Sequence, residues 1–98
     1  LIETKMRHQA TVIVAVIVKE KGKYLLVQEA KSSCRGKWYL PAGQVEIGED
    51  IYTAGIRECE EESGMQIKPQ GVFQAQYDAN AHFDWVRFGI VGKIVGGK

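Results

Sequence analysis

The sequence predicts an α+β domain in which one helix packs on a mixed β-sheet. Three observations lead to this prediction. Residues 10–18 and 85–95 are rich in β-branched and apolar side chains, residues 50–63 have helical spacing, and a length of 98 residues suits one domain. Because the order is strands, one helix and then strands, without internal repeats, we expect the helix to cover one face of the sheet.

The first half of the chain contains two predicted strands and a loop. Residues 10–18 form a near-continuous β-branched run, which is typical of a strand buried on both faces. The polar residues 19–22 follow, and residues 24–28 are predicted as a second strand, so a hairpin is expected. Residues 30–37 are small and polar, as in a surface loop, and residues 38–40 form a short apolar segment after it.

The helix is predicted from about Asp50 to Ser63. Its apolar or small residues recur every three or four positions, as helical burial of one face requires: Ile51, Ala54, Gly55 and Cys59. Glu49 and Asp50 lie near the positive end of the helix dipole. Gly64 is suited to the left-handed conformation that ends a helix.

Two further strands are expected after the helix, at residues 72–77 and 85–95. Both segments are apolar and contain β-branched or aromatic side chains. The polar residues 78–81 would form the turn between them. With strands on both sides of the helix in the sequence, the sheet is expected to be mixed.

Composition and charge exclude several classes of partner. The chain is 45% hydrophobic and 26% charged, as in ordinary globular proteins, and its net charge of +1 gives no reason to expect nucleic-acid or membrane binding. Cys34 and Cys59 form no CxxC unit, so we expect free thiols and a cytoplasmic location. The oligomeric state stays open.

Four glutamates crowd the last turns of the predicted helix. Helical geometry places Glu58 beside Glu61 and Glu62, whereas Glu60 points about 200° away. Acidic side chains at this end oppose the helix dipole. One interpretation is a solvated acidic face. The other is a Mg²⁺ or Mn²⁺ site, because clustered carboxylates are the hard ligands that these ions prefer. Spacing alone supports the two interpretations about equally.

A longer pattern includes these glutamates and begins before the helix. It consists of Gly, five residues, Glu, seven residues, Arg-Glu, an aliphatic residue, any residue, Glu-Glu, any residue, Gly and an aliphatic residue. The chain supplies Gly43, Glu49, Arg57, Glu58, Cys59, Glu61, Glu62, Gly64 and Met65. The pattern resembles the Nudix hydrolase box at every fixed position, and seven chance matches at a background near 7% have a probability on the order of 10⁻⁸. Cys59 and Met65 depart from the usual aliphatic residues, but both are apolar and should still pack.

The segments that flank the box extend the resemblance. Residues 27–43 and 85–88 are similar to Nudix enzymes that hydrolyse 8-oxo-guanine nucleoside diphosphates. The resemblance implies conversion of 8-oxo-dGDP to 8-oxo-dGMP, which removes an oxidised nucleotide from the pool. Two alternatives stay open. One is hydrolysis of a nucleotide sugar, a dinucleotide or a nucleoside triphosphate. The other is a non-catalytic nucleotide-binding module, although such modules usually lose the box glutamates that this chain keeps.

The resemblance also implies roles for the box residues. Glu58, Glu61 and Glu62 are expected to hold Mg²⁺ or Mn²⁺, with the Gly43 carbonyl as a further ligand. The cation would neutralise the diphosphate and lower the pKa of the attacking water, and Glu58 would accept a proton from that water. Arg57 is expected to take part in catalysis indirectly by orienting the carboxylates, or to form a plain salt bridge with Glu61.

The remaining site predictions concern the loop and the base. Glu49 is expected to hold the loop before the helix or to bind a second metal. Leu25, Trp38 and Leu40 are expected to contact the substrate. Packing is the commoner role for an aromatic residue such as Trp38, and core packing is an equally good role for Leu25.

The family resemblance refines the expected fold to an α/β/α sandwich with a mixed sheet. Nudix domains generally run well past 98 residues and have a further helix on the second sheet face. We therefore expect residues 1–98 to be a single Nudix hydrolase domain without its C-terminal helix. Without that helix, one sheet face would be left uncovered.

Overall fold

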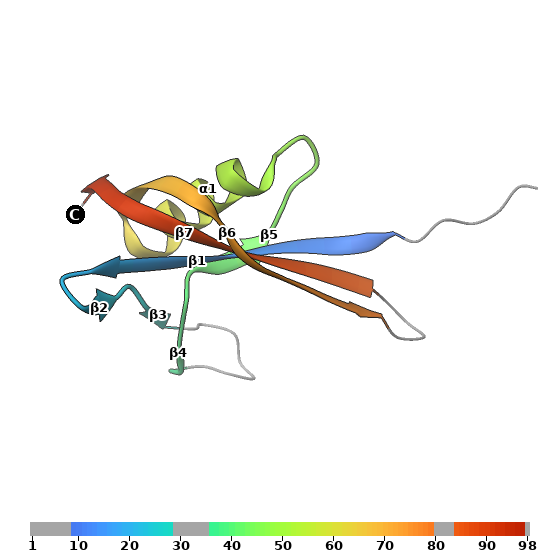
Figure 1. Cartoon of the computed structure of the whole chain (residues 1–98), viewed down its shortest axis with the longest axis horizontal. Coiled ribbons are helices and arrows are strands. Elements are labelled where there is room, and N and C mark those ends of the chain that lie inside the picture. The colour runs from blue at the N-terminus through green and yellow to red at the C-terminus, as the bar shows by residue number, and fades with distance from the viewer. Residues whose placement is uncertain (1–8, 29–35, 80–83, 98) are drawn as a thin grey trace, which may run out of the picture.

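The computed structural model describes residues 9–28, 36–79 and 84–97 (Figure 1). In this part of the chain it contains one helix, α1 (Ile51–Ser63), and no helix that is long and apolar enough to cross a membrane. The strands are β1 (Ala10–Glu20), β2 (Lys23–Tyr24), β3 (Val27–Gln28), β4 (Trp38–Tyr39), β5 (Ala42–Gln44), β6 (Met65–Ala79) and β7 (Asp84–Gly97).

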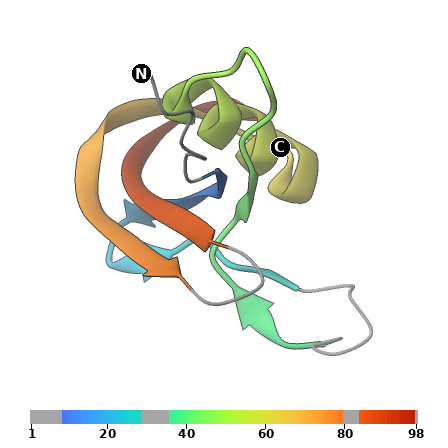
Figure 2. The same ribbon diagram turned by 90° about the vertical axis from the view of Figure 1, so that its right-hand side faces the viewer.

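The main sheet is mixed, and α1 lies on one side of it (Figures 1 and 2). Strand β1 runs parallel to β7, and β7 pairs with β6 in antiparallel fashion. Along its other edge, β1 pairs antiparallel with β2 and with β5, while β3 and β4 form a separate two-stranded ribbon. The predicted α+β class with a mixed sheet and one helix is confirmed.

The core lies between α1 and the sheet. Alternate residues of a strand share one face, and α1 packs on the face of β1 that bears Val14, Val16 and Val18. The other buried members of this cluster come from α1, β6 and β7: Ala54, Cys59, Ile67 and Ile90. On the opposite face of β1, Ala15 is buried but Ile13 and Ile17 are only partly so. The predicted burial of β1 on both faces is therefore complete on the helix side and only partial on the other side.

Local chemistry sets the two ends of α1. Asp50 is the N-cap, with extended backbone angles, and its carboxylate accepts a hydrogen bond of 2.8 Å from the Thr53 N–H. Gly64 has a φ of 78°, and its N–H donates to the Glu60 carbonyl at 2.8 Å. Both predicted ends are confirmed, with Asp50 as the cap rather than the first helical residue.

The predicted hairpin is present, but the predicted strand at residues 24–28 is broken. Lys21 and Gly22 both have positive φ angles, as a two-residue hairpin turn between β1 and β2 requires. Directly after β2, Leu25 still donates its N–H to the Val18 carbonyl of β1 at 2.9 Å and packs against the core. The chain then leaves β1, and residues 27 and 28 pair with β4 instead, as strand β3.

Strands β6 and β7 are longer than the sequence predicts. Strand β6 begins directly after the helix cap and continues through residue 79, so two residues of the predicted turn at 78–81 belong to the strand. Its register shifts three times, near Gln66, Pro69 and Val72. Such bulges accommodate proline and glycine within a strand, and they mask the alternation by which a strand is predicted. Residues 30–35 of the predicted loop and residues 80 and 81 of the predicted turn lie outside the described residues.

Candidate active site

Strand β5 places alternate backbone groups toward β1 and toward the carboxylates of α1. The Val16 N–H donates to the Pro41 carbonyl at 2.9 Å, and the Val45 N–H donates to the Val12 carbonyl at 2.8 Å. Gly43 lies between residues 41 and 45 in the same register. In an antiparallel ladder every second residue faces its partner strand. The Gly43 carbonyl is therefore directed at β1, whereas the backbone groups of Ala42 and Gln44 point outward.

Side chains of α1 use these outward groups. The Gln44 carbonyl accepts a hydrogen bond of 3.1 Å from Arg57 Nη2, and the Ala42 N–H donates a long bond of 3.4 Å to Glu62 Oε1. The Ala42 carbonyl shares this outward direction, because the N–H and C=O of one strand residue point the same way. The edge of β5 thus offers one backbone oxygen beside the acidic side chains of the helix.

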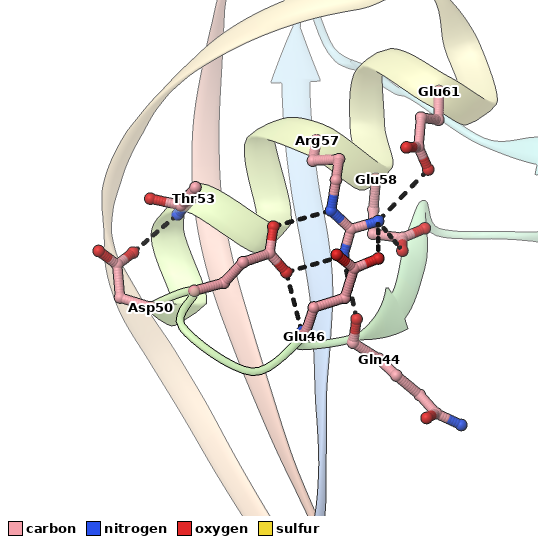
Figure 3. Close-up of polar contacts among 8 residues, drawn as sticks. Gln44, Glu46, Asp50, Thr53, Arg57, Glu58 and Glu61 are labelled. Atoms are coloured by element: carbon pink, nitrogen blue, oxygen red, sulfur yellow. Dashed lines mark hydrogen bonds and ion pairs between the residues drawn. The ribbon is translucent and has the colours of Figure 1, made fainter.

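Arg57 connects the loop, the helix and β5. Its Nε and Nη2 donate to the two oxygens of Glu49 at 2.8 and 2.9 Å, and its Nη1 donates to Glu58 Oε1 at 2.7 Å (Figure 3). A weaker contact of 3.4 Å joins Nη1 to Glu61. Both predicted contacts of Arg57, with Glu58 and with Glu61 at i+4, are therefore present in the structure. The planar guanidinium suits such bidentate contacts.

The loop before α1 is closed around Glu49. The Glu46 N–H donates to Glu49 Oε1 at 2.9 Å, and the Glu49 N–H donates to the Glu46 carbonyl at 3.0 Å. Hydrogen bonds from Arg57 and from the Glu46 backbone lower the pKa of Glu49 to about 2. Hydrogen bonds to Glu49, and secondly to Glu58, raise the pKa of Arg57 above its usual value. The pair is thus held in its charged form, with Glu49 fastening the loop to the helix.

Gly43 allows the Glu58 carboxylate to lie directly against β5. A Cβ atom built at Gly43 would overlap all three atoms of that carboxylate. Only 14% of the Glu58 side chain is exposed, whereas Glu61 is 59% exposed. The glycine that begins the sequence pattern and the first glutamate of the helix therefore meet because no side chain separates them.

The structure brings some of the predicted metal ligands together. Glu58 and Glu62 both reach β5, at Gly43 and Ala42 respectively, and Glu61 lies further out on the helix surface. Among the described residues, no three His, Cys, Asp or Glu side chains converge closely enough to hold a metal ion. The donor chemistry nevertheless fits Mg²⁺, because carboxylate and carbonyl oxygens are the hard ligands that this ion takes.

The three predicted substrate residues lie in different places. Leu25 packs against the core. Trp38 is 61% exposed on β4 and is paired with Gln28. Leu40 lines a cavity of about 160 Å³ on the sheet face opposite α1. The structure therefore associates only Leu40 with a cavity close to β5.

This cavity is lined by residues that were not predicted from the sequence as part of the site. Its small lining residues are Ala15 and Gly89, which are paired across β1 and β7. The larger ones are Leu40, Phe73, Gln74, Gln76 and Arg87. A signal for them does exist in the sequence, since two glutamines alternate along one strand and a lone arginine interrupts an apolar strand. The signal becomes specific only when the register of the strands is known.

Comparisons with known proteins agree with this geometry. The family model described as NUDIX domain matches residues 7–93. The 8-oxo-dGDP phosphatase NUDT18 of Homo sapiens is 42% identical over 86 residues, covering 88% of this chain and 26% of that protein. Putative nudix hydrolase 1 of Caenorhabditis elegans is 42% identical over 89 residues, covering 88% of this chain and 24% of its own length. The chain thus spans about a quarter of these curated relatives.

Solved structures resemble the fold. A NUDIX hydrolase from Nitrosomonas europaea superposes with a TM-score of 0.81 at 32% identity, covering 92% of this chain and 62% of that one. An ADP compounds hydrolase shares the fold at 19% identity, with a TM-score of 0.79 over 96% of this chain and 51% of that one. The matches in sequence and in structure cover nearly all of the chain, which therefore belongs to the NUDIX domain family.

Proposed function

We propose that the protein hydrolyses the diphosphate of a nucleoside diphosphate with the help of Mg²⁺ or Mn²⁺, and that it converts 8-oxo-dGDP to 8-oxo-dGMP. The observation that carries this proposal is the meeting of Glu58 and Glu62 with the edge of β5. The printed name of the human relative, 8-oxo-dGDP phosphatase, supports the substrate. The role would be removal of an oxidised nucleotide in the cytoplasm, where reducing conditions keep the buried thiol of Cys59 free.

Four groups are suited to holding the cation. Glu58, Glu61 and Glu62 would supply carboxylate oxygens, and the Ala42 carbonyl replaces the Gly43 carbonyl, which the register directs at β1. Such a cation supplies neutralisation of the negative charge on the diphosphate. The contact of Arg57 with both Glu58 and Glu61 keeps two of these carboxylates oriented toward the same region.

Glu58 is the group that accepts a proton from the attacking water. Arg57 Nη1 occupies its Oε1 at 2.7 Å, so Oε2 remains for the proton. Arg57 is a positioning residue in this proposal. Its orientation in turn depends on the two bonds from Glu49, which fix the guanidinium plane.

The test compares three glutamate variants of the full-length protein. Glu58→Gln and Glu62→Gln should lower turnover of 8-oxo-dGDP by about 10²–10⁴-fold, the usual contribution of a general base or charge-bearing ligand. Glu60→Gln is the matched control, because Glu60 is exposed on the same helix and points away from Glu58. It should retain wild-type turnover. Undiminished turnover in Glu58→Gln would refute the assignment.

Two results would overturn other parts of the proposal. In a substrate panel, preference for a nucleotide sugar, a dinucleotide or a nucleoside triphosphate would exclude 8-oxo-dGDP as the principal substrate. Calorimetry that shows tight nucleotide binding without hydrolysis and without a need for Mg²⁺ would indicate a binding module instead of an enzyme.

A further inference from the structure

The cavity beside Leu40 is built by an irregularity in the sheet. The register between β6 and β7 passes from Val72 opposite Ile90 to Gln74 opposite Gly89, so Phe73 is an extra residue at a bulge. The Phe73 ring takes the space above Gly89 in which a side chain would lie, because a Cβ there would overlap the ring. The bulge and the glycine together bring an aromatic ring to the cavity.

The cavity combines apolar and polar groups. Ala15, Leu40 and Phe73 give it an apolar lining, and Phe73 remains 50% exposed. Gln76 and Arg87 are register partners across β6 and β7, so their side chains leave the same face next to each other. An apolar lining with a few convergent polar groups is typical of a small-molecule site, and an aromatic ring favours stacking with a flat heterocycle.

Strand β5 links the cavity to the carboxylates. Leu40 lines the cavity, and Ala42 and Gly43, two and three residues later, lie at the contacts with Glu62 and Glu58. Among the described residues, β5 pairs only with β1, so its other edge borders both regions. A nucleotide that crosses this edge would have its base in the cavity and its diphosphate at the glutamates. A volume of about 160 Å³ suits a base and is below that of a site for a whole ligand.

We infer that Arg87 and Gln76 distinguish 8-oxoguanine from other bases, an inference that rests on the proposed function. The edge of 8-oxoguanine carries two oxygens, O6 and O8, with an N7–H donor between them. Arginine offers only donors, which suit the oxygens, and a glutamine carbonyl accepts the N7–H. Undamaged guanine lacks both O8 and the N7–H. Adenine presents an amino group in place of O6, which would face the donors of Arg87.

Arg87→Met in the full-length protein tests this inference. It keeps an apolar stem and removes the donors, so kcat/KM for 8-oxo-dGDP should fall by about 10- to 100-fold, the discrimination expected of a bidentate arginine contact. The ratio of kcat/KM for 8-oxo-dGDP to that for dADP should fall as well. Arg87→Lys keeps a donor, so its kcat/KM for 8-oxo-dGDP should lie between that of Arg87→Met and that of the wild type.

Lys93→Met is the matched control. Lys93 is an exposed residue of β7 that does not line this cavity, and its substitution changes the charge by the same amount. It should leave the ratio unchanged. If Arg87→Met lowers kcat/KM for both substrates equally, or gives the same kcat/KM values as Lys93→Met, the inference fails while the proposed function stands. If the wild type cleaves no nucleoside diphosphate, the proposed function itself fails.

Discussion

At the scale of single residues, the site depends on the absence of a side chain at Gly43. The Glu58 carboxylate occupies the position that a Cβ would take, and it does so at the edge strand where the Ala42 backbone faces outward. A glycine is needed here for close approach rather than for an unusual backbone angle, since Gly43 is not among the residues with positive φ. A substitution at residue 43 can therefore displace the Glu58 carboxylate without straining the backbone.

Gly43→Ala should consequently lower turnover more than stability. The added methyl group would displace the end of a flexible side chain, so kcat should fall by about 10-fold or more if Glu58 acts as a base, with little change in Tm. Kinetics and thermal unfolding measure the two effects. In a Glu58→Gln background the same substitution should add almost no further loss, because both changes act on one group. Equal, additive losses would show that Gly43 acts elsewhere.

Glu49 should make stability depend on pH in the acid range. Its pKa falls from 4.5 to about 2 in the folded protein, so the unfolded chain binds the proton more readily. The stabilisation is fully present above pH 4.5 and is lost as the pH falls toward 2. Urea unfolding of the wild type and Glu49→Gln should show a difference that is constant near neutrality and shrinks in that window. A difference that grows as the pH falls would contradict the ion pair.

At the scale of elements, the helix is held to the sheet at a second glycine. A Cβ at Gly55 would overlap Ile90 Cδ1 in the core and would press on Val16 at 3.3 Å. Overpacking of this kind costs about 1–3 kcal/mol. Gly55→Ala should therefore lower the free energy of unfolding by that amount, despite the higher helix propensity of alanine. Glu60→Ala, an exposed change on the same helix, should stay within about 0.5 kcal/mol. A stabilised Gly55→Ala would refute the close approach.

The ends of the elements differ in how far the sequence predicts them. The limits of α1 follow from local chemistry, because the cap at Asp50 and the left-handed Gly64 each satisfy groups within one turn. The start of β6 does not follow from local chemistry. Pro69 and Gly71 would locally favour a break, but they lie inside the strand at a register shift that depends on pairing with β7. The break between β2 and β3 is likewise a tertiary feature, because residues 27 and 28 pair with β4 rather than with β1.

At the scale of the whole molecule, one part of the site follows from local sequence patterns and another part depends on the register of the strands. Helical periodicity is sufficient to predict that Glu58 and Glu62 share a face, and the structure brings both to β5. The outward direction of Ala42 depends on the register of β5 with β1. The pairing of Gln76 with Arg87 depends on the register of β6 with β7 after a bulge. Such registers are tertiary facts that no local pattern contains.

The proposed role of the acidic face of α1 and the edge of β5 is to hold a divalent cation that cleavage requires. Its most direct test is the rate at which full-length protein treated with EDTA forms 8-oxo-dGMP from 8-oxo-dGDP while Mg²⁺ is added back. Turnover should be absent without the ion and should recover in a saturable way as Mg²⁺ is added, and Glu58→Gln should fail to recover. Undiminished cleavage in EDTA would show that the protein needs no divalent cation.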